Sequence, residues 1–250
     1  MTPFHVVTFY EITYVKDAEK LGRGVERIAT QENLSGTFFS TPQGVNATLS
    51  GSLEGLEKII YLLQNSYAFN FIPTWSVAKK IPFKRFKIKL KDKLLPLDGD
   101  FDPVKRRGEH VKPDCWNELI SDPDTLVVDV RNNYESDIGS FKNSIVPGTD
   151  NFIDFPEYAE SNLKTHKNQK IAMFCTGGIR CEIASSFLMS KGFEKVYQLE
   201  GGVLNYLESI KTEDQLWEGE CFVFDERVSV NKALEEGNFI QCFGCRRPLT

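Results

Sequence analysis

Residues 171–187 read IAMFCTGGIRCEIASSF. Four apolar residues come first, then a cysteine, two glycines and an arginine, and then apolar residues at helical spacing. This order predicts a buried strand, a short loop that begins at Cys175, and a helix from Cys181 to about Lys191. In open α/β sheets, ligands bind at the carboxyl ends of the parallel strands. The loop at Cys175 is therefore the first candidate site.

The segments around this stretch extend the same pattern. Residues 126–130 form a second apolar run that contains Asp129, and residues 196–199 form a third. Gly201-Gly202 then separates the third run from a helical pattern at 203–211. Strands that alternate with helices predict a parallel α/β sheet with helices on both faces.

The N-terminal part of the chain follows a different order. Its segments succeed one another as strand, helix, strand, strand, helix, strand, which is typical of a ferredoxin-like α+β domain. We therefore expect an α/β protein with this α+β domain at 1–92, a linker at 93–112, a parallel-sheet domain at 113–212, and a short cysteine-containing tail at 213–250. The segments behind the first domain are strands at 4–14, 36–41, 45–49 and 74–91, the last long or broken, and helices at 17–33 and 53–64.

The loop at Cys175 has the composition of an anion cradle. Gly177 and Gly178 allow successive backbone N–H groups to turn inward, and the helix that follows adds the positive end of its dipole. A thiol in this position is expected to be largely thiolate at neutral pH, because the charged form is the one that is stabilised. Arg180 closes the loop and can reach the same anion. The alternative is an inert, buried cysteine.

Composition limits the class of protein. The 250 residues are 41% hydrophobic and 26% charged, as in ordinary globular proteins, and the chain begins without a secretory signal pattern. Apolar runs are all shorter than the roughly 18 residues of a membrane helix. We therefore expect a cytoplasmic protein without membrane contact, whose six cysteines are reduced and available for catalysis or for a metal.

Charge is distributed unevenly. The net charge is -5, yet residues 79–93 hold eight Lys or Arg and one acid. Such a stretch can attract a polyanion by releasing counterions from phosphates, and Phe83 and Phe86 within it could stack on bases. The alternative is a solvated edge strand, where lysines discourage aggregation. The candidate contacts for an anionic substrate are Lys84, Arg85 and Lys87.

Three segments resemble rhodanese domains. Residues 175–180 resemble their six-residue active-site loop, residues 129–135 (DVRNNYE) their DVR-x-x-x-E segment, and residues 199–202 (LEGG) their Gly-Gly segment. The resemblance covers about 113–212 and implies a rhodanese-like fold in which Cys175 forms a persulfide. One departure is visible, because residues 139–141 are Gly-Ser-Phe where many rhodanese domains have Gly-His-Ile.

A wider set of motifs narrows the resemblance. FCTGGIRCE (174–182), PQGVN (42–46) and WEGECFVFDERV (217–228) occur together. This set is similar to the bacterial rhodanese-domain proteins that act as oxygen-dependent tRNA uridine hydroxylases. The resemblance implies hydroxylation of wobble uridine 34 to 5-hydroxyuridine, with tRNA as the partner and molecular oxygen as the co-substrate. It also favours a tRNA contact through the basic stretch 79–93.

The resemblance also implies roles for individual residues. Cys175 is the expected persulfide-forming nucleophile. Asp129 and Arg131 are expected to orient the loop, or else to form an ion pair that stabilises the fold. Cys181 is a candidate resolving thiol, with helix packing as the alternative. The backbone amides that would hold the outer sulfur belong to Thr176, Gly177, Gly178, Ile179 and Arg180.

The tail carries half of a metal-site pattern. Cys242 and Cys245 look like one knuckle of a zinc ribbon, whereas a structural zinc usually takes two such pairs. Cys221 is the candidate third ligand, and the sequence offers no obvious fourth. In the family that the chain resembles, a second cysteine pair tends to follow. We therefore expect zinc only in a longer chain, and two ordinary thiols here.

Other functions are compatible with the same loop. A sulfurtransferase would move sulfane sulfur from thiosulfate or a protein persulfide to cyanide, a small thiol or tRNA. A non-catalytic RNA-binding protein is a third interpretation. A cysteine phosphatase is a fourth, although phosphate-binding versions of this loop tend to be one residue longer. The motifs identify neither an oxygen-activating cofactor nor the small-molecule or protein donor of sulfur or electrons.

Overall fold

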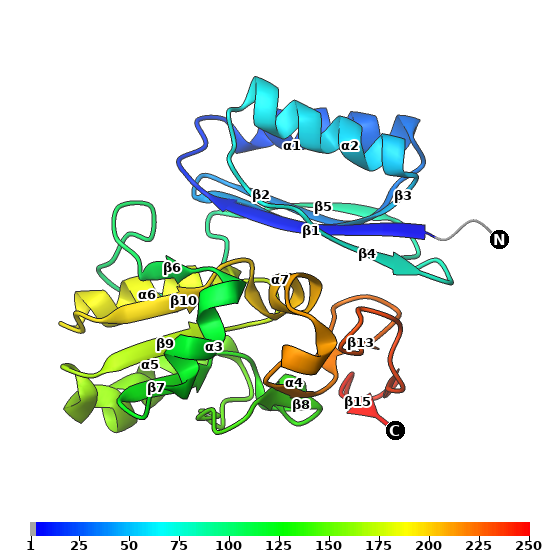
Figure 1. Cartoon of the computed structure of the whole chain (residues 1–250). Helices are drawn as coiled ribbons and strands as arrows, with labels where there is room; N and C mark the ends of the chain where they lie inside the picture. The colour runs from blue at the N-terminus through cyan, green and yellow to red at the C-terminus, as the bar shows by residue number, and fades with distance from the viewer. Residues whose placement is uncertain (1–3) are drawn as a thin grey trace. The chain divides into compact units, whose positions relative to one another are not determined.

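The computed structural model describes residues 4–250 (Figure 1). The chain divides into two compact units. The first comprises the chain up to Leu94 together with Phe224–Arg227. The second comprises Leu95–Val223 and Val228–Thr250. A short piece of the C-terminal tail therefore belongs to the N-terminal unit.

The first unit has a mixed five-stranded sheet. Its strands lie in the order β4-β1-β3-β2-β5, and the first four are antiparallel neighbours. This order and the two helices confirm the predicted ferredoxin-like α+β domain. The elements are β1 (Phe4–Ile12), α1 (Ala18–Gln31), β2 (Ser35–Thr41), β3 (Gly44–Gly51), α2 (Leu53–Tyr61) with a π-helical turn at Leu62–Ser66, β4 (Thr74–Ala78) and β5 (Phe86–Leu90).

The predicted strand at 74–91 is broken into two strands at opposite edges of the sheet. β4 pairs with β1, whereas β5 pairs in parallel with β2. Residues 79–85 between them carry part of the basic stretch and cross from one edge to the other. The strand pattern alone could not show this, because it does not reveal which neighbour each half pairs with.

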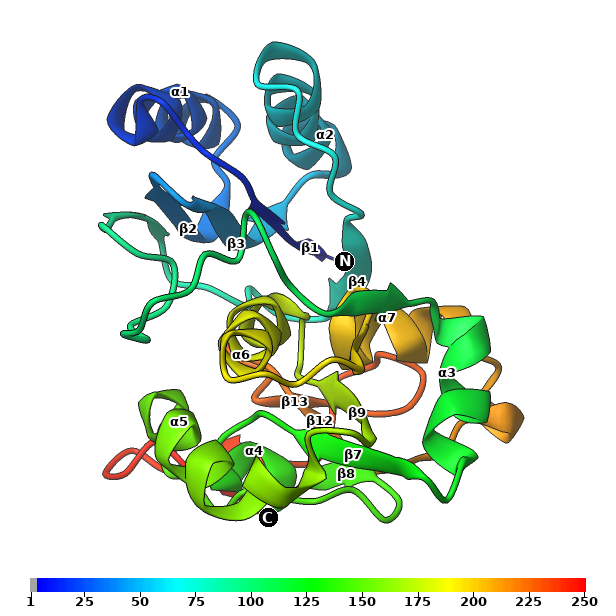
Figure 2. The same cartoon turned by 90° about the vertical axis from the view of Figure 1, so that its left-hand side faces the viewer.

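Both helices of the first unit cover one face of its sheet (Figure 2). Leu21 and Val25 of α1 are fully buried with Phe9 and Phe38, which alternate along β1 and β2 with more exposed residues. Each helix begins at a side-chain cap: Asp17 accepts from the Lys20 amide, and Ser52 from the Gly55 amide.

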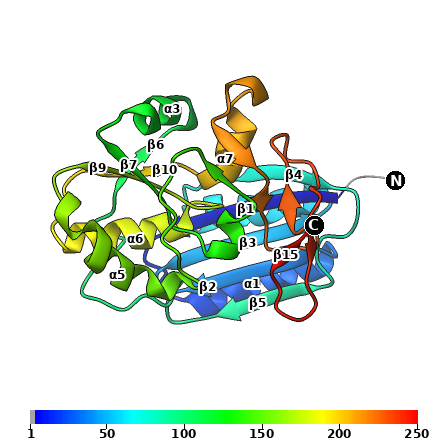
Figure 3. The same ribbon diagram turned by 90° about the horizontal axis from the view of Figure 1, so that it is seen from below.

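The second unit has a parallel sheet in the order β6-β10-β9-β7. Helices α3 and α7 pack together on one side of it, and α5 and α6 on the other (Figure 3). This confirms the predicted parallel-sheet domain. Its main elements are β6 (Glu109–Val111), α3 (Pro113–Ser121), β7 (Thr125–Asp129), α4 (Asn133–Ser136), β8 (Gly139–Phe141), α5 (Phe155–Tyr158), β9 (Lys170–Phe174), α6 (Ile179–Ser190), β10 (Val196–Leu199) and α7 (Gly202–Ser209).

The tail adds short strands to the second unit. β11 (Trp217–Gly219) pairs antiparallel with β8, β12 (Cys221–Phe222) with β13 (Ser229–Val230), and β14 (Ile240–Gln241) with β15 (Pro248–Leu249). Trp217 is fully buried against Phe141 and Phe174. The first part of the tail therefore completes the core of this unit. Within residues 4–250, none of the helices combines the length and apolarity needed to cross a membrane.

Candidate active site

Cys175 lies at the carboxyl end of β9, between that strand and α6. β9 is an inner strand, with β7 on one side and β10 on the other. The apolar side chains of residues 171–174 are fully buried, which fixes the strand end in place. Cys175 itself is 1% exposed. The loop therefore starts from a rigid point of the sheet, as the sequence predicts.

Glycine gives the loop its shape. Gly178 has φ of 98°, in the left-handed region that favours glycine, and it caps the N-terminus of α6. Its amide donates a hydrogen bond of 3.1 Å to the Cys175 sulfur. The helix begins at Ile179, two residues before the predicted start, so Arg180 and Cys181 lie in its first turn. The positive end of the helix dipole therefore points toward the sulfur.

Helix α7 also holds the loop through backbone hydrogen bonds. The amides of Val203 and Leu204, in the first turn of α7, donate to the carbonyls of Cys175 (2.9 Å) and Thr176 (3.1 Å). Gly202 lies so close that a Cβ atom there would come within 2.6 Å of the Cys175 carbonyl oxygen, and its φ is +68°. Only glycine satisfies both requirements, which explains the Gly-Gly segment in physical terms.

The surroundings of Cys175 favour its charged form. Burial raises the pKa of this thiol, but donors and positive charge outweigh burial. They are the Cys181 thiol, the Arg180 guanidinium, and the backbone amides of Cys181 and Arg180. The net pKa falls from 9.0 to about 6. Cys175 is therefore mostly thiolate at neutral pH, as the loop composition predicts.

Arg180 is fastened to a carboxylate that the sequence analysis did not single out. Its two terminal nitrogens donate to Glu135 at 2.6 and 2.7 Å, and both side chains are buried. Glu135 also accepts from the Asn132 amide at 3.1 Å and from the Thr176 hydroxyl at 3.3 Å. Its signal was its place as the last residue of the DVR-x-x-x-E segment. Glu135 therefore fixes Arg180, and Arg180 acts on Cys175 through its charge.

Asp129 and Arg131 form a separate buried network. Nε and Nη2 of Arg131 donate to Asp129 at 2.8 and 2.6 Å. Nη2 also donates to the Gly139 carbonyl, and Nη1 donates to the Glu135 carbonyl. The Ser140 hydroxyl donates to Asp129 at 2.9 Å, from the position where many rhodanese domains carry histidine. These bonds tie β7 to α4 and β8. They favour the ion pair that stabilises the fold over direct support of the loop.

Cys181 is the second cysteine of the site. It is fully buried in the first turn of α6, and both its thiol and its amide act on the Cys175 sulfur. Burial raises the pKa of Cys181, and the neighbouring Cys175 raises it further, so that it lies well above 9.0. The site therefore pairs one thiolate with one protonated thiol.

Two family profiles match the chain. The UPF0176 acylphosphatase like domain matches residues 4–94, and the rhodanese-like domain matches residues 112–209. This is the domain architecture of the bacterial rhodanese-domain tRNA uridine hydroxylase family. The first unit accordingly contains the acylphosphatase-like domain and Phe224–Arg227, and the second contains the rhodanese domain and the rest of the tail.

Solved structures similar to this chain cover less than half of it. The Alr3790 protein of Anabaena is 22% identical over 44% of this chain and 91% of its own, with a TM-score of 0.37. A rhodanese-related protein of Thermoplasma volcanium is 26% identical over 40% of this chain and 91% of its own, with a TM-score of 0.33. A Rhodopseudomonas palustris protein described as a possible tyrosine phosphatase is 21% identical over 41% and 81%, with a TM-score of 0.34.

The tail reaches the rhodanese loop from the side. The Phe222 carbonyl accepts a long hydrogen bond of 3.5 Å from the Thr176 hydroxyl, and the Phe222 ring packs edge-on against Tyr134. Cys221, one residue earlier, is fully buried in the core. Burial raises its pKa to about 12, although Arg131 lowers it in part. Cys221 is therefore an inert thiol of the core.

The half zinc ribbon forms a small hairpin of its own. Cys242 and Cys245 lie between β14 and β15, where loop amides lower the pKa of the Cys242 thiol. Cys221 does not join them: across residues 4–250, no three His, Cys, Asp or Glu side chains are grouped closely enough to hold a metal ion. The expected third ligand is thus a core residue.

The candidate RNA contacts lie in the acylphosphatase-like domain. Lys84 and Arg85 directly precede β5, and Lys87 lies within it; all three are exposed. β5 is an edge strand, and Phe86 packs on the core of the domain. Phe86 therefore serves the fold, while the basic side chains face solvent. The position suits both a polyanion contact and the charged strand edge that discourages aggregation.

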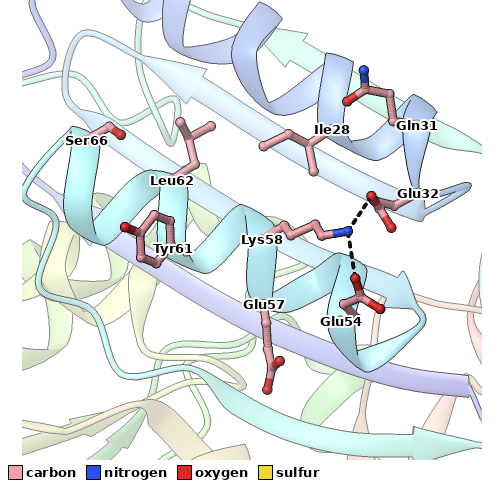
Figure 4. Close-up of a pocket in the computed structure, with 9 residues that line it drawn as sticks. All are labelled: Ile28, Gln31, Glu32, Glu54, Glu57, Lys58, Tyr61, Leu62 and Ser66. Atoms are coloured by element: carbon pink, nitrogen blue, oxygen red, sulfur yellow. Dashed lines mark hydrogen bonds and ion pairs between the residues drawn. The ribbon is translucent and has the colours of Figure 1, made fainter.

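A groove of about 480 Å³ lies between α1 and α2 in the same domain (Figure 4). Ile28 and Leu62 form its apolar part, and Lys58 binds both Glu32 and Glu54 at its side. Its carboxylates outnumber its one lysine. This groove is thus unsuited to a polyanion, in contrast to the β5 edge.

Proposed function

We propose that the chain hydroxylates wobble uridine 34 of tRNA at C5, with Cys175 as the nucleophile and molecular oxygen as the co-substrate. The observation that carries the proposal is the lowered pKa of Cys175, about 6, in a chain with this domain architecture. At pH 7 such a thiol is about 90% ionised. The nucleophile is therefore ready without a separate general base.

The proposed chemistry uses the thiolate as a covalent catalyst. Addition of the Cys175 sulfur to C6 of uracil makes C5 electron-rich. One atom of O₂ then forms the new C5–O bond, while the other leaves as water with two electrons and two protons from an external thiol reductant. Loss of the C5 proton and departure of the thiolate restore the ring. The loop amides and Arg180 stabilise the thiolate again as it leaves.

The substrate side of the proposal rests on charge and on the shape of the anticodon loop. The exposed basic residues at and before β5 supply counter-charge for phosphates. A wobble base is unpaired and can be splayed out at low cost, so the protein does not have to open a duplex. A single-stranded loop is thus the form of uridine that this enzyme would take.

Sulfur transfer is a second candidate, and one observation favours it. Cys175 is 1% exposed, so an acceptor must reach deep into the loop to meet the thiolate. A persulfide carries the reactive atom outward by one S–S bond, about 2.05 Å. The inward-facing amides would then hold the outer sulfur.

Nucleoside mass spectrometry separates the two candidates. Cells that lack the protein are complemented with wild type, Cys175→Ala or the control Cys221→Ala. Hydroxylation predicts a 5-oxygenated wobble uridine that wild type and the control restore and Cys175→Ala does not. An unchanged oxygenated pool together with altered thiolated uridine would replace hydroxylation by sulfur transfer. If Cys175→Ala restored the modified uridine as well as wild type does, Cys175 would be excluded as the nucleophile in both candidate functions.

A further inference from the structure

The site contains a second cysteine, Cys181, although the proposed reaction uses only Cys175 as the nucleophile. Both thiols are buried, and the Cys181 thiol is one of the donors that lower the pKa of Cys175. Both residues are tied to Gly178, whose amide donates to the Cys175 sulfur at 3.1 Å and whose carbonyl accepts from the Cys181 amide at 3.0 Å. A disulfide between the two cysteines would therefore lie within one short loop held by Gly178.

We propose that Cys181 is the resolving thiol of Cys175 and closes a Cys175–Cys181 disulfide whenever Cys175 carries a persulfide or a sulfenic acid. From a persulfide, the Cys181 sulfur attacks the inner sulfur, the S–S bond to the outer sulfur breaks, and hydrogen sulfide leaves with both protons. From a sulfenic acid, formed by a hydroperoxide, the S–O bond breaks and water leaves. The inference rests on the reactive Cys175 of the proposed function and not on its substrate.

The electrostatics of the pair provide a trigger. In the resting state burial and the Cys175 thiolate both raise the pKa of Cys181, so its proton stays in place. Conversion of Cys175 to a sulfenic acid removes the negative charge beside Cys181. The positive Arg180, which lowers the pKa of Cys181, then acts without that opposition. Oxidation of the first sulfur therefore activates the second.

Such a step has a chemical purpose at this site. A low-pKa thiolate that works with oxygen is exposed to oxidation, and a sulfenic acid that is not resolved proceeds to sulfinic acid, which is irreversible for most proteins. A disulfide stops that progression and is reversed by reductant. Helix packing alone would require a small buried side chain at this position and would not require sulfur.

The sequence makes the test direct. Trypsin cleaves after Lys170, Arg180 and Lys191, so Cys175 and Cys181 fall into separate peptides, 171–180 and 181–191. The reduced full chain is treated with one equivalent of hydrogen peroxide, alkylated and digested without reductant. We expect a linked pair of these two peptides that dithiothreitol separates. Release of hydrogen sulfide from the persulfide-loaded chain, with the same linked pair, is the expected second readout.

Matched variants exclude a general effect of oxidation. Cys181→Ala is expected to give about tenfold more Cys175 sulfinic acid than wild type at a second equivalent of peroxide. Cys221→Ala, which removes another fully buried thiol of the same unit, is expected to behave as wild type. Equal sulfinic acid in wild type and Cys181→Ala, with no linked pair, would overturn the inference, as would a linkage of Cys175 to Cys221.

The outcome is independent of variant folding and of the proposed function. The linked peptides are sought in the wild-type chain, so a Cys181→Ala protein that does not fold leaves the result decisive. The readouts also contain no tRNA. A linked pair in a chain that leaves uridine unchanged would support the resolving role and reject hydroxylation. A chain that hydroxylates uridine and forms no linked pair would do the reverse.

Discussion

The catalytic loop and the tail strand β12 each place a cysteine in full burial, with opposite chemical results. Cys175 and Cys221 are 1% and 0% exposed, yet their pKa values are about 6 and about 12. Burial raises both. Only Cys175 also receives amide and thiol donors, and its neighbour Arg180 lies in the first turn of a helix. A position between the end of a strand and the start of a helix, and not depth in the protein, therefore makes a thiol reactive.

The largest expected difference between the two cysteines is in activity. Cys175→Ala is expected to abolish both uridine hydroxylation and sulfur loading, because no other thiolate lies in the loop. Cys221→Ala is expected to retain both, since this thiol only fills the core. Nucleoside mass spectrometry and a sulfur-loading assay on the purified chain check the pair. Loss of activity in Cys221→Ala with unchanged stability would contradict the purely structural role of Cys221.

Alkylation rates test the pKa values themselves. At pH 7 the thiolate fractions that follow from pKa values of 6 and 12 differ by about 10⁵-fold. Iodoacetamide is therefore expected to label Cys175 with a midpoint near pH 6 and to leave Cys221 unlabelled until the chain unfolds. Mass spectrometry of the labelled peptides follows both sites at once. Cys181→Ala is expected to move the Cys175 midpoint upward by about one pH unit, because a donor is lost.

The ionisation of Cys175 also links stability to pH. Its folded pKa lies below the value of 9.0 for an unperturbed thiol. The thiolate therefore contributes stability that is full above pH 9, declines as the pH falls, and is lost below about pH 6. Urea unfolding of wild type and Cys175→Ala between pH 6 and 9 is expected to show this slope in the wild type alone. Parallel curves would contradict the low pKa.

Glu135→Gln tests the role of the carboxylate that fixes Arg180. The substitution leaves a buried guanidinium without its counter-charge and is expected to cost about 3–5 kcal/mol in the free energy of unfolding. Asp150→Asn is the matched control, because its pair with Arg247 is exposed, and it is expected to cost under about 1 kcal/mol. Urea unfolding measures both, and a loss in Glu135→Gln no larger than in the control would refute the role.

The smallest effect is expected from residues of the other domain. Lys84→Glu with Arg85→Glu is expected to weaken tRNA binding about tenfold at low salt and to flatten its salt dependence. The control Lys20→Glu with Arg27→Glu makes the same charge change on exposed residues of α1. Filter binding at several salt concentrations compares them, and alkylation of Cys175 should be unchanged in both. Identical binding by the two variants would remove the β5 edge from the proposal.

The sequence predicted those features that depend on neighbours along the chain. The loop after β9 lies within residues 175–180, so its glycines and its reactive cysteine could be predicted from one stretch. The sequence identified Arg131 and Arg180 as site residues, but it did not identify all of the groups that they bind. Arg180 is separated from Glu135 by 45 positions, and only the fold brings them together. The Asp129–Arg131 pair spans two positions, yet its bonds to β8 decide that it serves the fold.

Pairing at the sheet edges and in the tail was likewise beyond the reach of a local pattern. β4 and β5 lie within one predicted strand segment, but β4 pairs with β1 and β5 pairs with β2. Cys221 was a metal-ligand candidate because of its residue type, whereas burial among apolar side chains decides its state. Such outcomes depend on contacts between residues far apart in the chain, which spacing does not encode.

The segment Phe224–Arg227 carries a consequence for how the protein is made. Arg227 donates to the Ser76 hydroxyl at 2.9 Å across 151 positions, and the Glu226 amide donates to the Pro82 carbonyl at 3.0 Å. The acylphosphatase-like domain is therefore completed by a segment that follows the whole rhodanese sheet along the chain, and its last contacts form only after that segment has been synthesised.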